Sequence, residues 1–159
     1  MEVRVLTLDL SINKPGYAIA DTNTNQVITF GHLTNKSSEG VYRRIDKNLQ
    51  FFLALIPKHQ IKAVWLELPA FSGRQKSHDM LTSQQGVFKY ALHKRNIPVY
   101  GISISDIKKH VTGKGTATKD EMVQAIRSKG YQVNTDDEAD AIGIYLTGYE
   151  KPFLDQVNQ

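Results

Sequence analysis

Cysteine is absent from the 159 residues of this chain. Its absence excludes disulfide bridges and zinc sites with thiolate ligands, and it fits a reducing compartment. The N-terminal residues show no signal-peptide pattern, and no apolar run is long enough to span a bilayer. We therefore expect a soluble, cytoplasmic protein with no membrane partner.

Several other features are missing from the sequence. It has no internal repeat, low-complexity tract or linker, so we expect one domain over residues 1–159, with a frayed tail from about residue 151. It also has no Walker motif, and Gly113 and Gly115 alone are only a weak indication of a phosphate-binding loop. We therefore expect no small-molecule cofactor.

Charge is distributed unevenly along the chain. The formal net charge is +4, and the basic residues gather at residues 47–62, 74–76, 89–95 and 108–119. The acidic residues are more localised, above all at residues 136–140. A basic chain with one concentrated acidic cluster predicts a nucleic-acid-binding protein with a metal site. The alternative is a solvated surface of mixed charge.

Short apolar runs alternate with helical stripes. The runs predict strands at residues 3–11, 17–20, 26–33, 61–69 and 96–102. Apolar spacing, with capping boxes at Thr118 and Thr135, predicts helices at residues 38–59, 76–94, 105–111, 118–129 and 135–149. Three strands come first, joined by short turns, and the later strands alternate with helices. We therefore expect an α/β fold with a mixed five-stranded sheet, antiparallel at first and then parallel, flanked by helices.

Two of the expected strands end in a single carboxylate. Asp9 lies near the end of the first strand and Glu67 near the end of the fourth. A buried ionised carboxylate must be paired, hydrogen-bonded or bound to metal, although Asp9 taken alone could equally end its strand and cap a turn. In the last helix, Asp137 and Asp140 are three residues apart and share one face, which continues with apolar residues. We interpret these four acids as one site.

Four neighbouring carboxylates require protons or cations. Two carboxylates about 4 Å apart repel by roughly 4 kcal/mol at an effective dielectric of about 20. Oxygen ligands without cysteine favour Mg²⁺ or Mn²⁺, and two such ions ~3.5–4 Å apart can activate a water for phosphodiester cleavage. The basic residues would contact backbone phosphates. Asp136 and Glu138, by contrast, are interpreted as first-turn acids that favour the helix dipole.

The sequence resembles the RuvC-like Holliday junction resolvases of the ribonuclease H-like superfamily, most of all the phage-encoded members. Residues 137–144 are similar to the family's helix motif of an acid, two residues, a second acid and then small or apolar residues. Asp9 matches the first-strand acid, and Glu67 matches the glutamate that ends the fourth strand. Residues 113–119 resemble a Gly-x-Gly loop that leads into a lysine. The resemblance covers about residues 3–149.

The resemblance implies a nuclease that resolves four-way or other branched DNA by paired cuts, with two Mg²⁺ or Mn²⁺ ions per active site. The four acids would bind the ions, and Lys119 would be a catalytic lysine. The expected DNA contacts are Lys108, Phe71, Arg74, Lys76 and Lys114. A homodimer suits a two-fold junction, and the helix at residues 76–94 would form its interface, unless that helix only packs on the sheet. A phage-encoded protein would act in the host cytoplasm.

Three alternatives remain open at this point. The same site could cleave an RNA–DNA hybrid, as in ribonuclease H. A non-catalytic junction-binding protein could use the acids for a structural ion. The third alternative is the related nucleotide-binding fold of sugar kinases, which is disfavoured because it usually needs two such domains.

The 5 histidines are scattered without ligand spacing, which favours surface or packing roles. Trp65 is expected in the core, and packing is also favoured over base stacking for Tyr17 and Tyr100.

Overall fold

The computed structural model describes residues 3–70, 73–151 and 155–159, which form a five-stranded sheet in the order β3-β2-β1-β4-β5. The strands are β1 (Arg4–Asp9), β2 (Gly16–Asp21), β3 (Gln26–His32), β4 (Ile61–Glu67) and β5 (Val99–Ile102). β2 pairs antiparallel with both β1 and β3, whereas β4 pairs parallel with both β1 and β5. The predicted sheet, antiparallel at first and then parallel, is confirmed.

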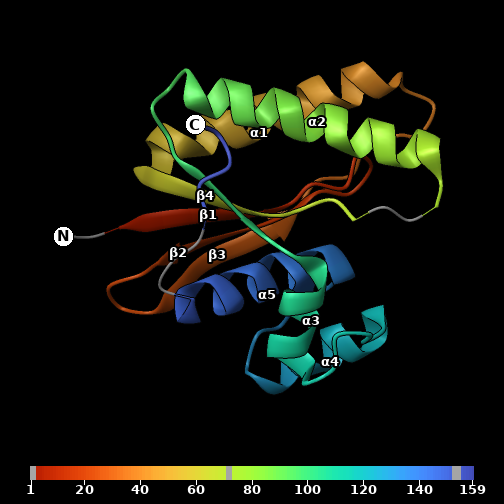
Figure 1. Cartoon of the computed structure of the whole chain (residues 1–159). Helices are drawn as coiled ribbons and strands as arrows, with labels where there is room; N and C mark the ends of the chain where they lie inside the picture. The colour runs from red at the N-terminus through yellow and green to blue at the C-terminus, as the bar shows by residue number, and fades with distance from the viewer. Residues whose placement is uncertain (1–2, 71–72, 152–154) are drawn as a thin grey trace.

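Helices cover both faces of this sheet. They are α1 (Val41–His59), α2 (Gln75–His93), α3 (Ile104–Thr112), α4 (Lys119–Ser128) and α5 (Asp136–Glu150). α1 and α2 lie on one face, and α5 lies on the other with α3 and α4 outside it (Figure 1). Most residues of α5 are therefore buried. None of the described helices is long and apolar enough to cross a membrane.

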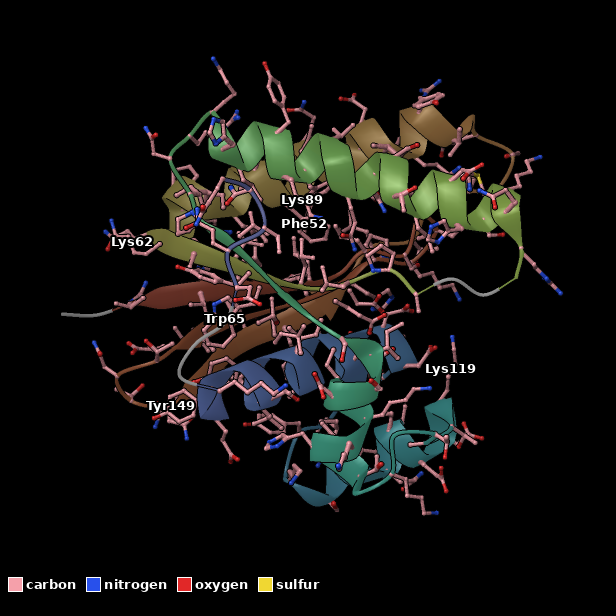
Figure 2. All side chains as sticks on the ribbon, viewed as in Figure 1. Phe52, Lys62, Trp65, Lys89, Lys119 and Tyr149 are labelled. Carbon is pink, nitrogen blue, oxygen red and sulfur yellow. The ribbon has the colours of Figure 1, made fainter. Side chains whose placement is uncertain are left out.

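Two apolar cores fill the spaces on either side of the sheet, because successive side chains of a strand point to opposite faces. Leu8 packs with Phe52 in the core beneath α1 and α2. Trp65 packs with Tyr145 in the core beneath α5, and their rings stack with centroids 5.9 Å apart. Figure 2 shows Phe52 and Trp65 on opposite sides of the sheet. The prediction that Trp65 belongs to the core is confirmed.

Local backbone chemistry sets the ends of several elements. The capping box at Thr118 is confirmed, because its hydroxyl accepts from the Glu121 N–H while the Glu121 carboxylate accepts from the Thr118 N–H. α1 begins three residues later than predicted, after Gly40, whose extended backbone precedes the first helical residue. β5 also begins later, after Pro98, which has no N–H to donate to a strand ladder.

The end of the chain differs from the frayed tail that we expected. The Val157 N–H donates to the Val99 carbonyl at 2.8 Å. The Asn158 side chain accepts from the Val99 N–H at 2.9 Å and donates to the Ile97 carbonyl at 2.8 Å. Residues 156–158 therefore cover the open edge of the sheet at β5, where unpaired backbone groups would otherwise be exposed.

Candidate active site

Asp9 and Glu67 end two neighbouring strands. β1 and β4 are parallel, with Leu8 beside Leu66, so the residue that follows each of them lies at the same edge of the sheet. Figure 1 shows that the starts of α2 and α5 lie at this same end of the molecule. The sheet therefore brings together the two strand-end acids that the sequence predicts for the site.

The N-terminal part of α5 adds Asp137 and Asp140 to this edge. Their three-residue spacing places both carboxylates on one helix face, as predicted. The helix is fixed on β1 by the buried Thr7 hydroxyl, which donates to the Ala141 carbonyl at 2.7 Å. Thr7 lies two residues before Asp9, and Ala141 directly follows Asp140. The hydrogen bond between them therefore fixes α5 against β1 close to the acids.

Gly16 allows α5 to approach the sheet closely. It pairs with Asp9 in the ladder between β1 and β2. A Cβ atom at this position would lie 2.1 Å from the Asp137 carbonyl oxygen, far inside a normal contact. The start of α5 therefore rests directly on the backbone of β2, and any side chain at residue 16 would displace it.

Asp9 and Asp137 share a hydrogen bond between their carboxyl groups. Burial raises the pKa of Asp9 well above its usual range, and the charges of Asp140 and Glu67 raise it further. Burial, followed by the charge of Asp136, also raises the pKa of Asp137. Without a cation in the site, Asp9 therefore holds its proton more strongly than an ordinary aspartic acid does.

The other two acids also retain protons more strongly than usual. Burial, and next the charge of Asp140, raise the pKa of Glu67 to about 7. Burial, with contributions from the acids at the start of α5, raises the pKa of Asp140 to about 6. Lys108 and Lys119 act in the opposite direction on both groups. The site is therefore a partly buried acidic cluster whose negative charge is only partly balanced.

Both lysines that the sequence assigns to this region lie beside the acids. The Lys119 Nζ donates to Asp136 at 2.6 Å, and the lysine side chain is 79% exposed. Figure 2 shows Lys119 at the start of α4, on the side of the molecule where α5 begins. Lys108 lies on α3, close enough to lower the pKa of Glu67 and Asp140.

The remaining predicted DNA contacts are exposed on the surface or fall outside the described residues. Arg74 and Lys76 are exposed at the start of α2, at the end of the molecule where the acids lie (Figure 1). Lys114 pairs with Glu121 at 3.0 Å. Phe71 lies outside the described residues.

Glu138 has contacts that the sequence did not reveal. The Thr135 hydroxyl accepts from the Glu138 N–H as a helix cap should, but the Glu138 carboxylate accepts from the Asn134 N–H at 2.7 Å. Its other oxygen lies 3.0 Å from Nδ1 of His32. The predicted capping box at Thr135 is therefore wrong, and Glu138 is a buried link between α5 and β3. The sequence alone could not show the contact between Glu138 and His32, because it depends on how the strands pair. The register of β2 and β3 places His32 beside Gly16, against which the start of α5 packs.

The chemistry of the four acids fits a divalent cation. All of them supply oxygen atoms, the ligands that Mg²⁺ and Mn²⁺ prefer. Burial and mutual repulsion raise their pKa values, and a bound cation would offset both effects. Among the residues that the structure describes, no three His, Asp or Glu side chains are already grouped for metal coordination. Asp9 is instead hydrogen-bonded to Asp137.

The sequence is similar to known proteins over nearly its whole length. It matches the family described as "Crossover junction endodeoxyribonuclease RuvC" over residues 5–148. A relative of that name from Protochlamydia amoebophila is 28% identical over 160 residues, covering 98% of this chain and 95% of the relative. Another from Ehrlichia ruminantium (strain Gardel) is 24% identical over 153 residues, covering 91% of this chain and 94% of the relative.

Solved structures show the same fold. The structure described as "Thermus thermophilus RuvC structure" matches with a TM-score of 0.77 at 18% identity, covering 98% of this chain and 100% of the other. "T. thermophilus RuvC in complex with Holliday junction substrate" matches with a TM-score of 0.80 at 17% identity, covering 98% and 99%. These similarities confirm the ribonuclease H-like fold that the sequence resemblance predicts.

Proposed function

This chain belongs to the crossover junction endodeoxyribonuclease RuvC family, and on that premise we propose how its four clustered carboxylates act on DNA. It is a nuclease that resolves four-way (Holliday) junctions by hydrolysing phosphodiester bonds. Nucleases of this family depend on divalent metal ions. The observation that carries our site assignment is the meeting of four acids, Asp137 buried and the other three partly buried, from β1, β4 and α5 at one edge of the sheet.

We infer that Asp9, Glu67, Asp137 and Asp140 hold two Mg²⁺ or Mn²⁺ ions. When bound, such ions supply Lewis-acid stabilisation of charge at the scissile phosphate and ease the ionisation of the attacking water. The four residues must lose their protons to serve as ligands. Asp9, whose pKa is raised most clearly by burial and by its acidic neighbours, would have to lose its proton to hold an ion.

We assign Lys119 a position beside the scissile phosphate. Among the described residues, its exposed ammonium group is hydrogen-bonded to Asp136 alone, at the rim of the site. An exchange of Asp136 for a phosphate oxygen preserves a charge-assisted hydrogen bond. Lys108 supports the site from α3, and exposed Arg74 and Lys76 contact the DNA backbone outside it, where phosphate contacts fix orientation rather than sequence.

We propose that the protein acts as a homodimer that contacts its partner through α2. Tyr90 is 67% exposed and Val87 is 38% exposed on this helix, so it presents apolar surface away from the sheet. A two-fold dimer places the same patch on both subunits and matches a substrate with two equivalent strands to cut.

Phage origin, cytoplasmic location and a single domain over residues 1–159 stay predictions.

The experiment that tests this proposal is cleavage of a synthetic four-way junction with Mg²⁺, compared with a linear duplex of the same arms. We expect paired nicks in the junction only. Asp9→Asn should slow cleavage by more than about 100-fold, since the loss of a partner outside the metal ligands already costs about 10–100-fold. Asp46→Asn, an exposed change on α1, should cleave like the wild type.

Other outcomes separate the alternative activities. Faster cutting of an RNA–DNA hybrid than of the junction would indicate a ribonuclease H-type substrate. Junction binding without cutting in any divalent metal would indicate a non-catalytic binding protein. If Asp9→Asn cut as fast as the wild type, the assignment of the four acids would be wrong.

A further inference from the structure

Two adjacent glutamines on α2 hold the backbone where β1 and β4 end. The Gln84 Nε2 donates to the Leu10 carbonyl at 2.8 Å, directly after Asp9, and the Gln85 Nε2 donates to the Glu67 carbonyl at 2.6 Å. We propose that Gln84 and Gln85 are positioning residues for the two strand-end carboxylates. The inference rests on the proposed function, because it concerns the same site.

The geometry of a helix lets one short segment serve two strands. Successive residues of an α-helix are roughly 100° apart around its axis, so adjacent side chains reach different neighbours. β1 and β4 lie side by side, and α2 crosses the face of the sheet above them (Figure 1). Both glutamines are buried, with exposed fractions of 0% for Gln84 and 5% for Gln85.

Gln84 belongs to a larger set of buried amides behind Asp9. The Asn48 Nδ2 donates to the Gln84 Oε1 at 2.8 Å and to the Ile12 carbonyl at 3.1 Å. The Asn35 Nδ2 donates to the Asn48 Oδ1 at 2.7 Å and to the same Ile12 carbonyl at 2.8 Å. Three amides from three segments therefore fix the chain that leaves the end of β1.

Gln85 makes its contact at the cost of an unpaired atom. Its Oε1 is buried and has no hydrogen-bond partner among the described residues. An unpaired buried acceptor is unfavourable, so an apolar side chain of the same shape would suit packing better. The bond that Gln85 does make is to the backbone of Glu67, whose carboxylate belongs to the site.

A fixed carbonyl restricts the peptide plane, and with it the direction in which the attached side chain leaves the backbone. Partners outside the metal ligands commonly set ligand orientation in this way, and their loss costs about 10–100-fold in metal affinity or activity. A purely structural role predicts something different: a loss of stability with unchanged metal binding in the molecules that remain folded.

The test compares Gln84→Met and Gln85→Met with the wild type, because methionine keeps the side-chain length and removes the amide. Gln50→Met, an exposed glutamine on α1, is the matched control. Mn²⁺ binding is measured by titration calorimetry without DNA, and junction cleavage is measured under single-turnover conditions across a range of Mn²⁺ concentrations. We expect each α2 variant to bind Mn²⁺ about 10–100-fold more weakly and to need correspondingly more Mn²⁺ for half-maximal cleavage. Metal-free junction affinity should stay unchanged.

Folding is checked by circular dichroism at the assay temperature. If a methionine variant does not fold, Gln84→Asn and Gln85→Asn replace it, since each keeps the amide but draws it back by one methylene. Folded variants that bind Mn²⁺ and cut as the wild type does would overturn the inference. Failure of the proposed function would appear in the wild type itself, as an absence of both Mn²⁺ binding and junction cleavage.

Discussion

At the scale of single residues, burial and mutual repulsion set the protonation of the acidic cluster. Glu67 and Asp140 have pKa values raised to about 7 and about 6, and Asp9 is raised well above its usual range. Each of these groups is more stable protonated in the folded protein than in the unfolded chain. Ionisation of the site without a cation therefore works against folding.

The free energy of unfolding of the metal-free protein should fall as pH rises from about 4 to about 7. In this interval the folded protein binds more protons than the unfolded chain, so the slope of stability against pH is negative. The loss should reach a few kcal/mol, because one pKa unit is worth roughly 1.4 kcal/mol. Urea denaturation in EDTA at several pH values measures it.

Two additions make this prediction specific. Glu67→Gln cannot ionise, so its stability should fall less steeply over the same interval. Mg²⁺ added at about pH 8 should recover stability in the wild type, since it binds the folded state. A wild-type curve that rises toward pH 7 would contradict the protonation of the cluster.

At the scale of elements, α5 carries half of the acids and depends on two contacts with the sheet. The Thr7 hydroxyl holds the helix from β1, and Gly16 gives it room on β2. The contact between Glu138 and His32 adds a third anchor, from β3. The distance from α5 to the strand-end acids is therefore set by the first three strands.

Gly16→Ala should lower both stability and activity. The new Cβ would overlap the Asp137 carbonyl, and overpacking of this kind typically costs about 1–3 kcal/mol. Because the displaced backbone belongs to an acid of the site, junction cleavage should fall even where the protein is fully folded. Gly40→Ala is the control, since a Cβ there meets nothing within 4 Å. Equal urea midpoints for the two variants would contradict this account of the helix contact.

The elements and the four acids could be predicted because their causes are local in sequence. Asp137 and Asp140 share a helix face by spacing alone, and Asp9 and Glu67 stand out at the ends of apolar runs. The contacts of Gln84 with Leu10 and of Glu138 with His32 could not be predicted, since they span 74 and 106 positions. Such contacts depend on strand register and helix placement, which no local pattern specifies.

At the scale of the whole molecule, the C-terminal residues complete the sheet. Asn158 is 8% exposed, and its side chain pairs with backbone groups at residues 97 and 99. Residues 156–158 thereby protect the edge at β5, whereas the opposite edge is formed by β3. The tail is thus part of the folded unit and contributes to its stability.

Asn158→Ala should destabilise the protein by about 1–3 kcal/mol, because it leaves the Val99 N–H and the Ile97 carbonyl without this side chain. Thermal unfolding measures the loss. Junction cleavage at a temperature well below the transition should stay near the wild-type rate, since the tail lies away from the site. Gln159→Ala, at an exposed neighbour, is the control. Identical melting of both variants would indicate a tail that adds no stability.

The bond between Thr7 and Ala141 joins positions 134 residues apart, so the site depends on elements that lie far apart in the sequence. During synthesis, a ribosome translates Asp9 long before it reaches Asp140. A nascent chain therefore has no complete acidic cluster while it is being made. An interrupted translation product that ends before α5 lacks two of the four acids, so on the proposed site assignment we expect it not to cut DNA.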